Sequence, residues 1–491
     1  MGYDCKKWES QGVRTVKGVI NAIISTLIRA PSSPAHVEQV PFEEASAAWK
    51  RGDYPTALRL TRELAEQGHV RAQTALGSLY MNGQGLPQDY AEAIRWYRKA
   101  AEQDDASAQT MLGVLYETGH GVLQDNVEAV RWFRLAAVQS HADAQAILGL
   151  RYAKGQVVPQ DDAEAVAWLR QASEQGHAAA QYRLGLRYIE GDGVAQDYAE
   201  AAKWYHQAAD QGEAAAQNGL GVMYEAGLGV AQDYAEAVKW YRRAAEQGNA
   251  FGQNNLGNKY ENRQGVPPDD AEAIKWYRKA AEQGHIGAHY NIGHMYFKGQ
   301  GLPQDYVEAA KWFRFAAEHG YTFAQGALGH MYQEGLGVSH DDAEALKWYR
   351  MAADLGDAAA QRQIGGMYAD GNGVPQDDKA AFKWFQMAAE NGDAAAHYNL
   401  GIMYAAGRGV PQNQAQALRH YQVAAVLGHA AAQCHLGVIY ADAEGVPRDD
   451  AEAFKWFQMA AEQGHAVAQH NLKIMYMSGR GVPKDYAPIK E

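Results

Sequence analysis

The chain has 491 residues, a formal net charge of −13 and a hydrophobic content of 47%. So negative a charge argues against nucleic acid and anionic membranes as default partners. The two cysteines, Cys5 and Cys434, cannot build a disulfide framework, which excludes a small disulfide-stapled fold.

Residues 1–40 have the pattern of a leader. Lys17 precedes an apolar stretch at residues 19–28, which is too short to span a bilayer, so stable membrane insertion is not expected. A basic start, a short apolar run and a small-x-small site ending at Ala35 predict a secretory signal peptide and an exported, periplasmic protein of bacterial type. Arg29, directly after the apolar run, leaves open the alternative of an uncleaved leader on a cytoplasmic protein.

Residues 41–69 are predicted to form a short helix pair that caps the N-terminal end of the fold. The helices are expected at residues 42–50 and 54–66, with a turn at Gly52 and Asp53 between them. A solenoid needs an atypical terminal unit of this kind to cover its first hydrophobic face.

From residue 70 onward the sequence repeats every 36 residues without insertion or deletion. Residues 70–465 hold eleven full copies, and residues 466–491 hold an incomplete twelfth. Self-similarity at such a period indicates stacked supersecondary units. Repeat position 7, counted from residue 70, is always Leu or Ile, and position 11 is always Tyr, as expected for side chains that meet the same neighbours in every copy.

Residues 214–249 illustrate the unit, which is predicted to be two helices. In the first helix, core-type residues such as Leu220 recur at helical spacing on one face. A glycine loop follows, and Asp233 with Glu236 then has the spacing of a capping box at the start of the second helix. Trp240 on the second helix is predicted to fill the seam to the next unit. We therefore expect an all-α, right-handed superhelical solenoid of two-helix repeats.

The loop between the two helices is rich in glycine, which tolerates positive φ angles. Three residues depart from this pattern, namely Val157, Arg263 and Ala443. We predict that the loops containing these residues differ locally from the others.

The repeated pattern A-x-A-Q-x-x-L-G-x-x-Y-x-x-G-x-G-V-x-x-D-x-x-E-A-x-x-W-x-x-x-A-A-x-x-G resembles the Sel-one-like repeat family, relatives of the tetratricopeptide repeats. Leu220, Gly221 and Tyr224 match the tetratricopeptide spacing, and the longer glycine loop marks the Sel-one-like variant. The resemblance implies a scaffold or adaptor that binds other proteins, in bacteria often at the envelope, and no shared chemistry. Activities claimed for some relatives leave open the alternative of a hydrolase acting on cell-envelope material.

No constellation in the sequence predicts a catalytic, cofactor or metal site. The pair formed by Asp233 and Glu236 recurs in nearly every copy, which a helix cap explains and a single active site does not. His285 and His289 could lie one helical turn apart, but no further ligand at a suitable spacing completes a zinc site. We therefore expect a non-enzymatic protein without a cofactor. Six histidines share the last repeat position, which indicates a role at the turn between repeats: His69, His141, His177, His285, His429 and His465.

The partner-binding surface is predicted on the first helices, at repeat positions 2, 5, 9, 12 and 13, which point away from the packing face. Most copies fill these positions with small or polar residues, among them Thr74, Thr110 and Glu117. Three consecutive central copies carry aromatics and histidines instead, and we predict that stacking joins them into one patch of a concave groove that binds proteins or peptides. The predicted patch consists of Phe251, Tyr290, His294, Phe297, Phe323 and His330.

Overall fold

The computed structural model describes residues 39–443 and 446–482. Within these residues the chain forms 25 helices and no strand, so the prediction of an all-α solenoid of paired helices is confirmed. Most of the leader expected at residues 1–40 and the last nine residues of the twelfth repeat lie outside the described residues. No helix in the described part of the chain has both the length and the apolarity needed to cross a bilayer.

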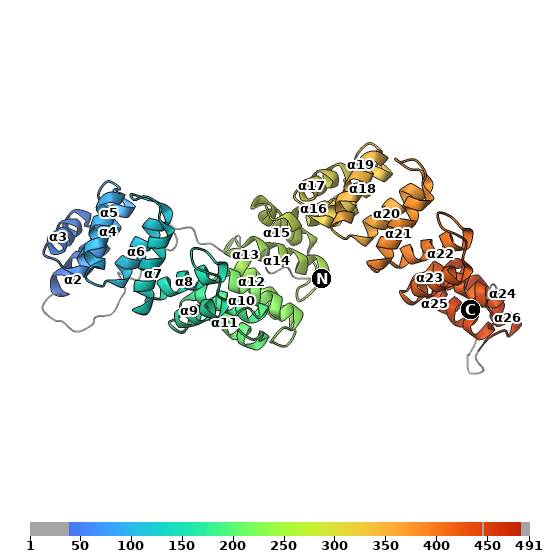
Figure 1. The fold of residues 1–491 in the computed structure, drawn as a ribbon, viewed down its shortest axis with the longest axis horizontal. Coiled ribbons are helices and arrows are strands. Elements are labelled where there is room, and N and C mark those ends of the chain that lie inside the picture. Colours follow the sequence, from blue (N-terminus) through green and yellow to red (C-terminus); the bar gives the residue numbers. More distant parts are fainter. Residues whose placement is uncertain (1–38, 444–445, 483–491) are drawn as a thin grey trace. The chain divides into compact units, whose positions relative to one another are not determined.

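The chain divides into two compact units, and the first comprises Met1–Pro268. Figure 1 labels the helices of this unit from α2 to α14. Within it, every described helix packs against the next helix in sequence. A short pair precedes the first repeat, and each repeat then contributes two helices, up to the first helix of the repeat at residues 250–285. The helices are α2 (Gln39–Lys50), α3 (Tyr54–Glu66), α4 (Val70–Asn82), α5 (Tyr90–Ala101), α6 (Ala106–Thr118), α7 (Asn126–Val138), α8 (Ala142–Lys154), α9 (Asp162–Glu174), α10 (Ala178–Glu190), α11 (Tyr198–Asp210), α12 (Ala214–Ala226), α13 (Tyr234–Glu246) and α14 (Ala250–Asn262).

The second unit comprises Asp269–Glu491 and is built in the same way. Consecutive helices pack on one another throughout its described residues. The helices are α15 (Asp270–Glu282), α16 (Ile286–Lys298), α17 (Tyr306–Glu318), α18 (Thr322–Glu334), α19 (Asp342–Asp354), α20 (Ala358–Asp370), α21 (Asp378–Glu390), α22 (Ala394–Ala406), α23 (Gln414–Val426), α24 (Ala430–Asp442), α25 (Asp450–Glu462) and α26 (Ala466–Ser478).

In most repeats a glycine of the first helix packs against an aromatic ring of the second helix. In α12, a Cβ added at Gly221 would lie only 2.5 Å from the ring of Tyr241 in α13, and that ring is fully buried. Any larger residue at this position would therefore collide with the second helix. Lys473 occupies the equivalent position of the last repeat, after which the described residues contain no second helix.

The loops after the first helices share one backbone geometry. Gly227 follows α12 in the left-handed region with φ 68°, and Arg263 and Ala443 adopt the same region with φ 60° and 59°. Val157 has φ 70°, close to the values of the glycines at its repeat position. The prediction of a local difference is therefore wrong for the backbone at Val157 and Arg263, because the packing of the repeat imposes the turn even where no glycine favours it. The loop after Ala443 includes residues 444 and 445, which lie outside the described residues.

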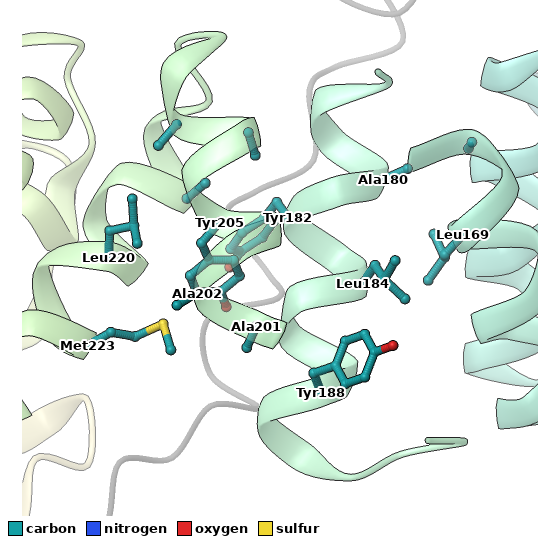
Figure 2. Packing of buried hydrophobic residues seen from close by; sticks show 14 of the residues in the cluster. Leu169, Ala180, Tyr182, Leu184, Tyr188, Ala201, Ala202, Tyr205, Leu220 and Met223 are labelled. Atoms are coloured by element: carbon teal, nitrogen blue, oxygen red, sulfur yellow. The ribbon is translucent and has the colours of Figure 1, made fainter. Parts of the chain in front are cut away.

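The hydrophobic core runs from one repeat into the next. Tyr205 of α11 lies beside Tyr182 of α10 with ring centroids 5.3 Å apart (Figure 2). Added Cβ atoms at Gly185 in α10 and Gly219 in α12 would lie 2.5 and 2.4 Å from the Tyr205 ring. The ring is thus enclosed by its own repeat and by the following one, and no repeat buries its core alone.

Tryptophan fills the contact on the side of the repeat opposite to Tyr205. Trp96 of α5 packs against Leu64 and Ala65 of α3 and against Leu76 of α4. Trp240 takes the equivalent place, with 6% of its surface exposed. The seam is therefore the one with the preceding repeat, and the prediction of a seam with the next repeat is wrong, because this side chain points back across its own first helix.

In most repeats a glutamine side chain bonds the first helix to the helices on both sides. Gln217 of α12 donates through Nε2 to the carbonyl oxygen of Ala209 at the end of α11, at 3.0 Å. Its Oε1 accepts from Nε2 of Gln247, which follows α13, at 2.7 Å. One buried amide thereby joins three helices of two repeats, and its donor and acceptor are both satisfied.

Candidate partner-binding site

The first helices of two successive repeats in the second unit bring aromatic rings together. Tyr290 of α16 lies 5.1 Å from the ring of Tyr321, which precedes α18, and 6.3 Å from Phe323 within α18. Phe297 of α16 lies 6.5 Å from the ring of His330 in α18. These centroid separations are those of interacting aromatic pairs. We call Tyr290, His294, Phe297, Tyr321, Phe323 and His330 the aromatic cluster.

Helical spacing places these side chains on one side of their helices. Tyr290, His294 and Phe297 are separated by four and three residues on α16, so they lie along one face. Phe323 and His330 are seven residues apart on α18, which is two turns on the same face. The stacking of the two repeats then sets the two faces side by side.

The buried ring of Phe313 packs against the aromatic cluster on its core side. Phe313 of α17 is 2% exposed, and its ring lies 5.5 Å from Tyr290 and 6.3 Å from Phe297. Phe323 is 63% exposed, whereas the other members of the cluster are half-buried. The cluster therefore offers one protruding ring on a base of rings that core packing holds in place.

The structure brings together five of the six predicted site residues. Tyr290, His294, Phe297, Phe323 and His330 all lie on α16 and α18 of the second unit. The sixth, Phe251, is half-buried on α14 of the first unit. Whether these residues bind a partner stays a prediction.

Two of the residues assigned to the same open face are buried, and that part of the prediction is wrong. Thr74 and Thr110 are both 0% exposed. The Thr74 hydroxyl donates to the Asp105 carboxylate at 3.1 Å, and the Thr110 hydroxyl lies 3.1 Å from Nδ1 of His141. The residue that directly precedes the next first helix covers this position, which a helical wheel of one helix does not show.

Sequence reasoning missed Tyr321 and a second group of rings. Tyr321 occupies the repeat position that elsewhere holds His, Asp, Asn or Glu, so an aromatic there was the available signal. In α22 to α24, Tyr398 lies 4.8 Å from His429 and 5.7 Å from Tyr421. The second group has Ala431 at the position of Phe323 and thus no protruding ring.

The aromatic cluster is built for contact rather than for proton transfer. Burial, and then the neighbouring Tyr290, raise the pKa of the Tyr321 phenol, so its ring stays neutral near pH 7. Its side chain makes no cap hydrogen bond to α18. Neutral rings of this kind bind aliphatic and aromatic side chains, and their faces also accept guanidinium groups.

A group of polar residues on α6 and α8 holds a serine, a histidine and an aspartate but not as a catalytic triad. Ser107 Oγ lies 3.4 Å from Nε2 of His141. The other ring nitrogen of His141 meets the Thr110 hydroxyl at 3.1 Å, and Asp143 is bonded to His177 at 3.1 Å. No carboxylate orients His141 toward the serine, as a triad requires.

The repeated histidines cap helices. Nδ1 of His285 accepts a hydrogen bond from the backbone N–H of Ala288 at 3.1 Å, and His69, His177, His429 and His465 cap their helices likewise. His141 makes no cap hydrogen bond. Burial, and to a lesser extent the nearby His289, lower the pKa of His285 to about 4. In the part of the chain that the structure describes, no three His, Cys, Asp or Glu residues are placed to hold a metal ion.

The comparisons with known proteins place this geometry in a family. The family model of the Sel1 repeat matches twelve consecutive segments, which begin at residue 70 and run at 36-residue intervals to residue 487. One similar solved structure is that of an Escherichia coli protein, a protective antigen of uropathogenic strains with an SLR fold. The two sequences are 37% identical, and the match covers 86% of this chain and 90% of that chain with a TM-score of 0.71. A Sel1 repeat protein of Oxalobacter formigenes is 30% identical over 70% of this chain and 99% of its own, with a TM-score of 0.48. A search of curated proteins found no match.

Proposed function

The chain belongs to the Sel1 repeat family, and from this premise we propose that it is a non-enzymatic scaffold that binds protein or peptide partners. Repeat folds of this kind generally serve protein–protein interaction. The observation that carries the proposal is the aromatic cluster of α16 and α18, where five rings lie on adjacent first helices around the protruding Phe323. Aromatic groups of this kind supply most of the energy of many interfaces.

The chemistry of the cluster indicates the kind of partner. A partner side chain that packs against Phe323 and Tyr290 would bury apolar ring surface that is now partly in water. The tyrosine and phenylalanine rings of the cluster offer no cation that would attract phosphate, and the net charge of −13 opposes nucleic acid. We therefore expect a peptide segment with aromatic, aliphatic or arginine side chains as the ligand.

The test uses the intact chain as bait for a peptide library displayed on phage. Peptides selected on the wild-type chain are then titrated against Tyr290→Ala and Phe323→Ala, and we expect at least about a tenfold loss of affinity for each variant. Val467→Ala is the matched control, because Val467 has the repeat position of Phe323 and is 56% exposed. Equal binding by all three variants, each folded by circular dichroism, would place the site elsewhere.

Export is a separate part of the proposal. Its support is the short apolar run at residues 19–28 and the small-x-small site at Ala35, as in a signal peptide. N-terminal sequencing of the protein recovered from the native cell tests it. A mature chain that starts shortly after Ala35 supports export, and an intact leader supports a cytoplasmic scaffold.

A further inference from the structure

Five of the six second helices described in the second unit carry a row of exposed apolar side chains, whereas the first of them, α15, has Lys279 at the same position. The row lies at repeat position 30 in α17, α19, α21, α23 and α25, and its members are between 36% and 42% exposed. Isolated exposed apolar residues are normal, but a row at one position of successive repeats is not scattered. Because these repeats fold alike and stack in sequence, their equivalent side chains lie along one side of the unit. The apolar row consists of Phe315, Met351, Met387, Val423 and Met459.

The first unit does not carry this row. At the same position it has mainly polar residues, in chain order Lys99, Leu135, Gln171, Gln207 and Arg243. Solubility and helix formation therefore do not require an apolar residue there. The apolar side chains begin at α17, which points to a contact that only α17 and the later second helices make.

Charges of opposite sign border the apolar row on its two sides. Four residues before each member stands a base, and three residues after it stands an acid in four of the five helices. With a rise of about 1.5 Å per residue, the bases lie about 6 Å to one side and the acids about 4.5 Å to the other. The bases are Lys311, Lys347, Lys383, Arg419 and Lys455, and the acids are Glu318, Asp354, Glu390 and Glu462.

We propose that the apolar row is a homodimer interface whose occupant is the same row of a second copy of this chain. Rotation by half a turn about an axis along the row sets each repeat against the same repeat of the partner. The basic border of one copy then lies over the acidic border of the other, while the apolar side chains meet in the middle. The surface is self-complementary in both charge and hydrophobicity, which is the requirement for a two-fold interface.

Among the five repeats, the one at residues 358–393 has the features that best suit such a contact. Most of the other bordering lysines bond an acid three residues earlier, as Lys347 does with Glu344 at 3.2 Å. Lys383 has Ala380 at that place, and among the described residues no ion pair of Lys383 occurs. In the two-fold arrangement its partner is Glu390 of the second copy. Met387 between them has a flexible side chain that adapts to an apolar surface.

The first test measures the mass of the full chain in solution by sedimentation equilibrium. We expect a dimer, and we expect Met351→Gln with Met387→Gln to weaken it at least about tenfold. Gln171 and Gln207 show that the repeat accepts glutamine at this position. The matched control is Leu135→Gln with Val138→Gln, which removes two exposed apolar side chains from the first unit and should leave the dimer intact. A wild-type chain that stays monomeric up to about 100 µM overturns the proposal.

The second test exchanges charges across the predicted two-fold axis. Lys383→Glu and Glu390→Lys should each weaken the homodimer, because each places like charges opposite one another. The double variant should restore the dimer, and an equal mixture of the two single variants should form the heterodimer in preference to either homodimer. Dimers of unchanged strength in all variants would mean that another surface joins the copies. Both tests are independent of the aromatic cluster, which lies on the first helices.

Discussion

Asn391 donates its side-chain amide to Oε1 of Gln361 at 2.9 Å, and one repeat earlier the residue at the position of Asn391 is Leu355. The consequence lies at Gln325, whose Nε2 donates to the Ala317 carbonyl oxygen at 3.1 Å but whose Oε1 is buried without a hydrogen-bond partner. An unsatisfied buried acceptor costs about 1–3 kcal/mol. The bond from Gln325 to the preceding repeat is thus made, whereas the bond that would link it to the end of α19 in its own repeat is missing.

Leu355→Gln should complete the link and raise the free energy of unfolding by about 1 kcal/mol, because Oε1 of Gln325 gains a donor. Urea denaturation followed by circular dichroism measures the change. Leu427→Gln is the control, since the residue it would meet is His397, whose Nδ1 already lies 3.1 Å from Nδ1 of His420. An equal gain in both variants would show that a polar side chain at this position stabilises the chain without a hydrogen bond to Gln325.

Gly365 and Gly366 are neighbours in α20, and we expect substitution by alanine to have opposite effects on stability at the two positions. A Cβ at Gly365 would lie 2.7 Å from the ring of Phe385, whereas a Cβ at Gly366 would meet nothing within 4 Å. Gly365→Ala should therefore lower the free energy of unfolding by about 1–3 kcal/mol through overpacking. Gly366→Ala should raise it by about 0.5–1 kcal/mol through helix propensity. Thermal denaturation of both variants checks the signs, and like signs would contradict the close packing of α20 on α21.

Trp240→Ala should leave a cavity between α13, α12 and α11 and cost about 3–5 kcal/mol. Hydrogen exchange should rise first in its own repeat and in the preceding one, because Trp240 packs into that seam. Mass spectrometry of peptides along the chain measures the pattern. Loss of protection spread evenly over the first unit would show that the repeats do not unfold locally.

Val157 holds a β-branched side chain at φ 70°, where L-residues are strained. Val157→Gly should raise the free energy of unfolding by about 0.5–1 kcal/mol, because relief of about 1–2 kcal/mol exceeds the entropy cost of a glycine. Val157→Ala retains a Cβ and should give less than half of this gain. Chemical denaturation of the wild type, Val157→Gly and Val157→Ala shows whether the gain in stability comes from relief of backbone strain or from the smaller side chain.

His285 makes the second unit sensitive to acid. Its pKa is lowered to about 4 in the folded chain and returns to about 6.5 on unfolding, so the unfolded chain binds the proton more tightly. Stability is therefore full above about pH 6.5 and falls as the pH drops toward 4, by on the order of 1–3 kcal/mol. Protonation of Nδ1 also breaks the cap hydrogen bond to Ala288.

His285→Asn should remove much of this acid sensitivity, because Asn249 caps the preceding first helix with an uncharged side chain. Denaturation midpoints at pH 7.5 and pH 5 measure it. The same substitution at His340, whose side chain is 60% exposed, is the surface control. An unaltered midpoint difference in His285→Asn would assign the acid sensitivity to other groups.

The sequence by itself determined the repeat, the helix pair within it and the family. Its 36-residue period, the capping position of Asp233 and the left-handed turn at Gly227 depend on neighbours close in the chain, and local contacts of this kind can be found from spacing alone. The comparison of twelve copies added the core positions, since a residue such as Tyr80 or Leu76 recurs wherever the environment recurs.

Only the tertiary structure decided which surfaces are open and which seam each side chain fills. Thr110 lies on the outer face of its helix but is buried by His141, which comes 31 residues later, and Trp240 packs backward rather than forward. Both outcomes depend on the angle at which one repeat meets the next, which no single helix encodes. The aromatic cluster shows the same division, because the sequence supplied Tyr290 and Phe323, whereas stacking added Tyr321 between them.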